Sequence, residues 1–176
     1  IAPNSTALIV FRVRVDNPIA RGVTQIANQG TITSREQPVL FTDDPSTPSL
    51  GDPTVTPITA APALSADKAA SLLNDLDGNG VVSPGDTLRY TVTLANTGNT
   101  EAAGLVYTDT PDRNGALVPG SVTTTQGQVA SGNNGAPPIV VNVGSLAAPN
   151  GRVTIAYDVV VANPLPVGVR ELVNQG

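Results

Sequence analysis

An internal repeat of 24 residues constrains this chain more than any other feature of its sequence. The segment ALIVFRVRVDNPIARGVTQIANQG, residues 7–30, resembles VTIAYDVVVANPLPVGVRELVNQG, residues 153–176, without a gap. The two segments start 146 residues apart. Self-similarity at such a spacing indicates one structural unit that recurs along the chain. We therefore expect this sequence to hold parts of two successive copies of one domain.

Both copies of the repeat begin with apolar residues at alternate positions: Phe11, Val13 and Val15 in the first, and Tyr157, Val159 and Val161 in the second. Alternate side chains lie on one face of a β-strand, so we expect two strands with these six side chains buried. An Asn-Pro pair follows each segment and should end the strand, because proline cannot donate to the ladder.

The rest of the sequence also favours an all-β fold. The chain contains 17 Gly and 16 Pro, and short apolar runs between such residues are typical of strands and turns. We expect the first half of residues 64–73 to be a strand despite its helix propensity. Further strands are predicted at residues 87–96, 104–110, 121–127, 138–146 and 152–163. Several short strands separated by turns favour a β-sandwich.

Two regions follow from the repeat and these strands. Residues 1–60 are interpreted as the C-terminal strands of a preceding repeat, followed by a Pro/Thr/Asp-rich linker that we expect to be a semi-extended connector. Residues 61–176 are interpreted as a second β-sandwich repeat that lacks its last strand. Because Ile1 is not an ordinary initiator, we expect the natural protein to extend upstream, where a signal peptide would lie.

Charge and composition exclude several classes of function. The formal net charge is −5, which does not favour a nucleic-acid partner. The sequence has no Cys, His, Met or Trp, so it lacks thiol and imidazole nucleophiles, disulfides and zinc sites of the usual kind. We therefore expect no enzyme. No apolar run approaches the length of about 18 residues that a membrane span requires.

The segment DLDGNGVVSPGD, residues 75–86, has the ligand pattern of a calcium-binding loop. Oxygen-bearing residues fall at positions 1, 3, 5, 9 and 12, and Gly80 falls at the sharp turn. The expected calcium ligands are Asp75, Asp77, Asn79, the Val81 carbonyl, Ser83 and Asp86. The last ligand is Asp rather than Glu and the loop leads into a strand, so an Asp/Asn/Gly-rich turn without an ion is the alternative.

The string SPGDTLRYTVTLANTGNTEAAGLVYTDTPD, residues 83–112, together with LVNQG, residues 172–176, resembles the bacterial surface repeat family called domain of unknown function eleven. The resemblance implies tandem immunoglobulin-like β-sandwiches of secreted or cell-surface proteins that serve as stalks, adhesins or fibres. It therefore implies a structural repeat at an extracellular location. The alternative function is a carbohydrate- or protein-binding module that uses loops at the ends of the sandwich.

Some related surface sandwiches carry an intramolecular Lys–Asn isopeptide bond, and this chain has candidates for one. Lys68 is its only lysine, and the expected partners are Asn174 as the amide and Asp109 as the catalytic acid. Burial favours the neutral, nucleophilic form of an unpaired lysine and raises the pKa of an Asp. Alternatively, Lys68 extends to solvent while Asp109 and Asn174 have structural roles.

The partners implied by a repeat protein are neighbouring copies of the same repeat. In a filament, residues 31–45 of a neighbouring copy or molecule would supply the missing last strand by strand addition. A simpler alternative is that the sequence is a piece of a longer tandem array.

Overall fold

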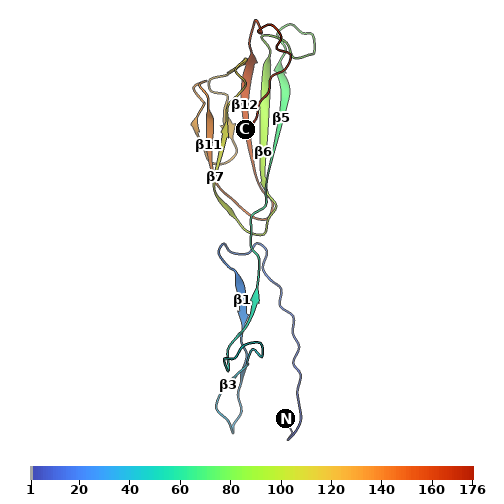
Figure 1. Ribbon diagram of the computed structural model, residues 1–176, viewed down its shortest axis with the longest axis vertical. Coiled ribbons are helices and arrows are strands. Elements are labelled where there is room, and N and C mark those ends of the chain that lie inside the picture. The colour runs from blue at the N-terminus through green and yellow to red at the C-terminus, as the bar shows by residue number, and fades with distance from the viewer. Residues whose placement is uncertain (1) are drawn as a thin grey trace.

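The computed structural model describes residues 2–176 and is elongated (Figure 1). A two-layer body built from residues 64–161 occupies one end, and a two-stranded ribbon built from residues 25–57 occupies the other. The described residues contain strands and no helix, so none that is long and apolar enough to cross a membrane. The prediction of an all-β fold is confirmed.

The first sheet of the body is antiparallel and has β12 (Gly151–Val161) near its centre. Its strand order is β5 (Leu64–Asn74), β6 (Thr87–Asn96), β12 and β8 (Gly115–Leu117), and the short β9 (Thr123–Thr124) also pairs with β12. Val92 of β6 lies opposite both Lys68 of β5 and Ile155 of β12, which fixes the register of the three long strands.

The second sheet has the order β10 (Gln128–Ser131), β11 (Ile139–Leu146) and β7 (Ala102–Asp109). Its strands are antiparallel. Strand β7 is an edge strand, because no other strand of residues 2–176 pairs with its outer side. An edge strand presents backbone N–H and C=O groups that are free to pair with another segment.

The core lies between the two sheets and consists of alternate apolar residues from each, an arrangement consistent with a β-sandwich. Its fully buried members are Val92, Ile139, Leu146, Val141, Val143, Val153, Ile155, Tyr157, Val159 and Val161. Because side chains alternate along a strand, β12 supplies half of these residues from one face. Strand β5 contributes little, since most of its residues are exposed.

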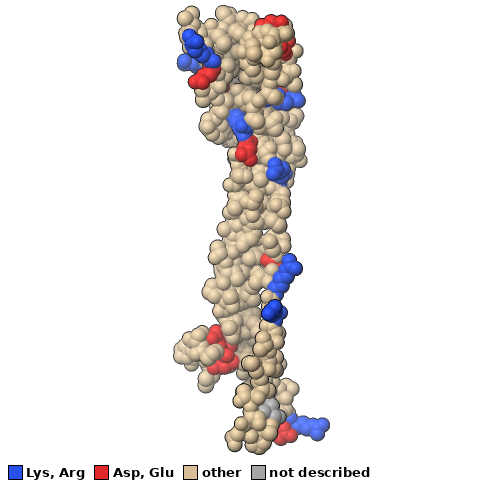
Figure 2. Space-filling model, turned by 90° about the vertical axis from the view of Figure 1, so that its right-hand side faces the viewer, with Lys and Arg blue, Asp and Glu red and all other residues tan. Residues whose placement is uncertain are grey.

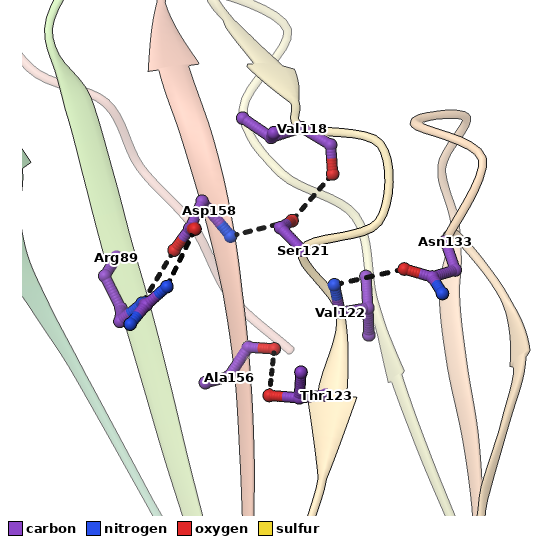
Figure 3. Close-up of polar contacts among 8 residues, drawn as sticks. All are labelled: Arg89, Val118, Ser121, Val122, Thr123, Asn133, Ala156 and Asp158. Atoms are coloured by element: carbon purple, nitrogen blue, oxygen red, sulfur yellow. Dashed lines mark hydrogen bonds and ion pairs between the residues drawn. The ribbon is translucent and has the colours of Figure 1, made fainter.

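A network of hydrogen bonds attaches residues 118–123 to β12 near Ala156 and Asp158 (Figure 3). The Ser121 hydroxyl donates to the Val118 carbonyl at 2.6 Å and accepts from the Asp158 amide at 3.1 Å. The Asp158 carboxylate accepts two hydrogen bonds, of 2.8 and 2.9 Å, from Arg89 on β6. These contacts hold β8, β9 and the turn between them in place at the end of the sheet.

The ribbon consists of two consecutive antiparallel pairs. Strand β1 (Gln25–Asn28) pairs with β4 (Thr54–Pro57), and β2 (Thr31–Ile32) pairs with β3 (Leu40–Phe41). The Pro/Thr/Asp-rich linker expected within residues 1–60 therefore contains one paired strand, β4. Nearly every residue of the ribbon is exposed, as expected for two strands without a covering layer.

The prediction of a strand with a buried face at residues 7–15 is wrong. This segment runs along the ribbon without strand pairing (Figure 1), and Phe11 and Val13 are 63% and 67% exposed. The equivalent Tyr157 and Val159 are 0% and 1% exposed in β12. The difference has a physical cause: β12 has β6 and β8 on its two sides, and the first copy has no such neighbours among the described residues.

Farther along, the two copies of the repeat do adopt the same local structure. The Val23 amide donates to the Ala20 carbonyl at 3.2 Å, and the equivalent Val169 amide donates to Pro166 at 3.1 Å. The glycine inside each turn has a left-handed backbone, with φ of 86° at Gly22 and 91° at Gly168, a conformation that glycine adopts without steric cost. The sequence repeat thus corresponds to a structural repeat at this turn.

Candidate functional site

The three residues predicted to form a cross-link meet at the open side of the body, between β5 and β7. Lys68 of β5 donates from Nζ to Asp109 Oδ2 of β7 at 2.5 Å, and the Asp109 side chain is completely buried. The Lys68 side chain is 18% exposed. Asn174, which follows the last strand, reaches the same place by donating from Nδ2 to the Tyr157 hydroxyl at 2.8 Å.

Two stacked tyrosines form the floor beneath Lys68. The rings of Tyr90 on β6 and Tyr157 on β12 have centroids 5.4 Å apart, since these residues are register partners on neighbouring strands. Lys68 Nζ lies 5.3 Å from the Tyr90 centroid and 5.8 Å from the Tyr157 centroid. Aromatic faces at this distance attract a cation, so the ammonium is held toward the core rather than toward solvent.

Two tyrosine hydroxyls complete the surroundings of Asp109. Tyr107 donates to Asp109 Oδ2 at 2.6 Å, and Tyr157 donates to the same oxygen. Asp109 Oδ2 therefore accepts from one ammonium and two phenols. Through the Tyr157 hydroxyl, which accepts from Asn174 and donates to Asp109, the carboxylate is connected to the amide group.

The electrostatics of Asp109 differ from the sequence-based expectation. Burial acts to raise its pKa, but the hydrogen bonds from Lys68, Tyr107 and Tyr157 outweigh it and hold the pKa below its ordinary value. The expectation of a raised pKa at Asp109 is therefore wrong. Lys68 is also not unpaired, because it forms an ion pair with Asp109. Burial also raises the pKa of Tyr107 and of Tyr157, and their bonds to Asp109 add to the shift.

One oxygen on each of the two carbonyl-bearing side chains has no partner. Asp109 Oδ1 and Asn174 Oδ1 are both buried and accept no hydrogen bond. Buried polar atoms are normally satisfied, and an unsatisfied one costs about 1–3 kcal/mol. If a proton moves from Lys68 to Asp109, the Asp109 carboxyl group gains an O–H that can donate a hydrogen bond, and Lys68 becomes a neutral amine. The cluster thus brings an amine, a carboxyl group and an amide together.

Sequence reasoning missed the roles of the three tyrosines at this site, Tyr90, Tyr107 and Tyr157. Tyr157 was assigned to the buried face of its strand, which is correct, but its hydroxyl was given no role. A tyrosine among valines on a buried face is a usable signal, since a buried phenol needs a hydrogen-bond partner. Tyr107 lies two residues before Asp109, hence on the same face of β7.

The predicted metal ligands form a second cluster, in the loop between β5 and β6. Asp75, Asp77 and Asp86 each offer a carboxylate oxygen, and these oxygens all lie within 4.8 Å of one another. Asp86 is fully buried, whereas Asp77 is exposed. Three negative charges this close repel one another, and a divalent cation between them would remove the repulsion.

Backbone amides inside this loop aim the carboxylates. The Gly78 and Gly80 amides donate to the two oxygens of Asp75 at 2.8 and 2.7 Å, and the Gly80 bond is the main reason that the pKa of Asp75 is lowered. The Leu76 amide donates to Asp86 Oδ1 at 2.8 Å, and the Ser83 amide donates to Asp86 Oδ2 at 2.7 Å. The two ends of the loop are thereby held together.

The remaining predicted ligands lie in the same loop. The Asn79 side-chain oxygen accepts from the Val81 amide at 2.7 Å, and the Ser83 hydroxyl donates to Asp77 at 3.2 Å and to Asp86 at 3.1 Å. The loop therefore brings together carboxylate, amide and hydroxyl oxygens, the hard donors that calcium prefers. This donor set fits Ca²⁺ better than a transition metal, because it contains no nitrogen or sulfur ligand.

No protein-family model, curated protein or solved structure matches this chain.

Proposed function

We propose that this chain is a structural repeat of an extracellular stalk, adhesin or filament, built from tandem immunoglobulin-like β-sandwiches and stabilised by an internal Lys68–Asn174 cross-link and by calcium. The observation that carries the proposal is the meeting of Lys68, Asp109 and Asn174 in one buried cluster. A bond there would join the first strand of the body to the segment after its last strand. Such a clamp resists extension, which is what a load-bearing repeat requires.

The cross-link forms by a balanced exchange. The Lys68 ammonium gives a proton to Asp109, and the neutral amine attacks the side-chain carbonyl carbon of Asn174. Protonated Asp109 donates to the Asn174 oxygen, which becomes the oxyanion. The new C–N bond forms, a proton of the attacking nitrogen passes to the Asn174 nitrogen, and the old C–N bond breaks to release ammonia. Ammonia takes up the proton of Asp109, so it leaves as ammonium and Asp109 is a carboxylate again. No oxidant and no cofactor is consumed.

Calcium would serve a different part of the same body. The loop of residues 75–86 connects β5 to β6, and an ion that binds only the folded loop stabilises the fold by mass action. Asp75, Asp77, Asn79, the Val81 carbonyl, Ser83 and Asp86 would hold it. The ion fixes one end of β5, while the cross-link fixes the middle of the same strand.

The intact mass of the purified protein tests the cross-link. We expect wild type to be lighter than its sequence by one ammonia, and peptide mapping to join Lys68 to Asn174. Lys68→Arg and Asn174→Ala should both have the unmodified mass. Asn28→Ala is the matched control, because Asn28 occupies the equivalent position in the repeat, and it should still show the loss. An unmodified wild-type mass would exclude the bond.

The binding-module alternative has less support. A hollow of about 330 Å³ lies at the β10–β11 turn, and its lining residues, 129–134 and 136–138, include no aromatic and no charged side chain. Carbohydrate and protein recognition usually depends on such groups. This hollow therefore gives the binding-module alternative no support.

A further inference from the structure

The open side of the body continues beyond the cross-link cluster as an apolar groove between the two sheets. It has a volume of about 350 Å³, and its lining includes Leu64 of β5, Leu94 of β6, Leu105 and Val106 of β7, and Gly176. Val106 is 58% exposed and Leu64 is 54% exposed. The groove runs beside the free edge of β7, so a strand placed there gains both backbone partners and apolar contacts.

The last described residues show how a strand would enter this groove. The Val173 amide donates to Asp112, beyond the C-terminal end of β7, at 3.0 Å. Gly176, in contrast, packs closely against Tyr107 of β7 and borders the groove. The segment therefore runs antiparallel to β7 past the side chains at its C-terminal end, without pairing with the β7 backbone. The groove lies directly along its continuation.

The internal repeat identifies a segment that fits the whole site. Residues 25–30 are equivalent to residues 171–176 and end in the same Asn-Gln-Gly. In the first copy the chain goes on with Thr31 and Ile32 of β2, which pair with β3. Placed as residues 171–176 are, this segment would align Asn28 with Asn174 and carry Ile32 into the groove lined by Leu64, Leu94 and Leu105.

The ribbon that contains this segment lacks a cover of its own. Ile32, Val39, Leu40 and Phe41 are 56%, 56%, 63% and 52% exposed. A two-stranded ribbon alone is at best marginally stable in water, and an exposed apolar patch of this kind marks an interaction surface. The ribbon and the groove are therefore complementary. The ribbon has exposed apolar strands, and the groove offers apolar side chains beside the unpaired edge of β7.

We propose that the free edge of β7 and the adjoining groove bind the β1–β2 segment of a second copy of this chain. The second copy displaces residues 171–176, extends the β10-β11-β7 sheet with β1 and β2, and buries Ile32 between the sheets. Strands β3 and β4 of the second copy stay paired with its β2 and β1, and so lie on the outer side of the extended sheet. The contact is non-covalent. Because residues 171–176 must move aside, a copy accepts a ribbon only while Lys68 and Asn174 are not joined, so the proposal is tested on Asn174→Ala, which cannot form the bond.

This contact is heterologous, because the donor and acceptor surfaces are different parts of one chain. Each copy that accepts a ribbon still presents its own, so assembly is open-ended and its mean size grows with concentration. The nearly neutral surface of the shaft (Figure 2) presents no large patch of one charge on the face shown that would oppose it.

Two substitutions separate the donor from the acceptor. Ile32→Asp removes the apolar donor residue, which lies outside the body and is exposed. Val106→Asp places a charge at the acceptor groove on an exposed position of β7. Val167→Asp is the matched control, since Val167 is fully exposed at 107% and lies outside both surfaces. Thermal melts verify that each variant folds.

The mass distribution of the full chain is measured by sedimentation velocity over a range of concentrations. Every sample carries Asn174→Ala, so that no cross-link holds residues 171–176 in place, and Asn174→Ala alone is the parent. We expect the parent and Val167→Asp to form oligomers of increasing size, and each of the other variants to be monomeric alone. An equimolar mixture of Ile32→Asp and Val106→Asp should give a dimer that grows no further, because only one donor and one acceptor remain. Ile32→Asp added to the parent should shorten the oligomers.

A parent that stays monomeric at all concentrations would overturn the proposal. Single variants that assemble like the parent would overturn it equally, and so would a mixture that stays monomeric. If Val106→Asp does not fold, the shortening of the parent's oligomers by Ile32→Asp decides the question alone: no shortening counts against strand donation. The cross-link is judged by the mass of wild type in a separate experiment.

Discussion

A single hydroxyl distinguishes the two copies of the repeat at the candidate site. Tyr157 connects Asn174 to Asp109 through its hydroxyl, whereas the equivalent residue of the first copy is Phe11. The phenol ring supplies the stack on Tyr90, and the hydroxyl supplies the alignment of the amide. The hydrogen-bonded cluster of the second copy therefore requires more than the apolar pattern that the two copies share.

The ion pair between Lys68 and Asp109 makes the free energy of unfolding depend on pH in the acid range. Its pKa is lower in the folded state than in the unfolded chain, so the stabilisation is complete above pH of about 4 and is lost as pH falls through the folded value. Asn174→Ala cannot form the cross-link and keeps the Lys68–Asp109 ion pair. For this variant we expect urea unfolding at pH 3 to show a clear loss of stability relative to pH 5.

The double variant Asp109→Asn with Asn174→Ala is the control for that measurement. It keeps the other acids, including Asp75 and Asp112, whose pKa values are also lowered. Its loss between pH 5 and pH 3 should be smaller than that of Asn174→Ala. Equal losses would mean that the Asp109 pair contributes nothing to acid sensitivity.

At the scale of elements, β12 is the strand on which the body depends most. It pairs with β6, β8 and β9, and Ile155 is completely buried at its centre. Ile155→Ala should lower the free energy of unfolding by about 2–5 kcal/mol, because it leaves a cavity in the core. Ile9→Ala tests the same change at the equivalent repeat position, which is 83% exposed, and should cost less than about 0.5 kcal/mol.

Urea unfolding of both variants measures the difference. A large loss in Ile9→Ala would show that residues 7–15 are covered in solution, contrary to their exposure in the structure.

The loop between β5 and β6 carries the calcium prediction. Calcium at a hundredfold excess over its dissociation constant should stabilise the wild type by about 2.7 kcal/mol, measured as a rise in the unfolding midpoint that a chelator reverses. Asp77→Asn removes one exposed carboxylate and should abolish most of the rise. Asp67→Asn, which makes the same change in charge at an exposed position on β5, should keep it. A wild-type midpoint that calcium leaves unchanged would exclude the site.

Strand pattern and repeat together predict much of the fold but not all of it. Residues 87–96 are predicted as a strand and form β6, and residues 138–146 contain β11. Residues 64–73 form a strand over their whole length, because β6 pairs with them and tertiary pairing outweighs helix propensity. The three-residue β8 and the four-residue β10 escaped notice because such short strands carry too few residues to show a period.

The candidate site was predictable in its members but not in its electrostatics. Lys68, Asp109 and Asn174 lie close together, as the resemblance to related surface sandwiches implies. The ion pair and its phenols could not be foreseen, because they depend on which side chains face each other across β5, β7 and β12. Non-local pairing is information that a local pattern does not contain.

The molecule as a whole is a narrow rod with few charges. The charged groups on the face shown in Figure 2 lie in small separate clusters, and most of the shaft is uncharged. Charged residues make up only 13% of the chain. Since screening by salt acts on exposed charges, ionic strength should have little effect on this fold apart from the calcium loop. Its shape and surface suit end-to-end connection better than capture of a charged ligand.

The lone lysine decides how amine-directed chemistry can reach this protein. Aldehydes, activated esters and acyl donors attack side-chain amines, and the 176 residues offer them Lys68 alone. The Lys68 side chain is only 18% exposed, and its amine contacts the Asp109 carboxylate and the rings of Tyr90 and Tyr157. The other basic side chains are all arginines. Reagents that cross-link side-chain amines, and proteases that cut after lysine, therefore have no well-exposed target among these residues.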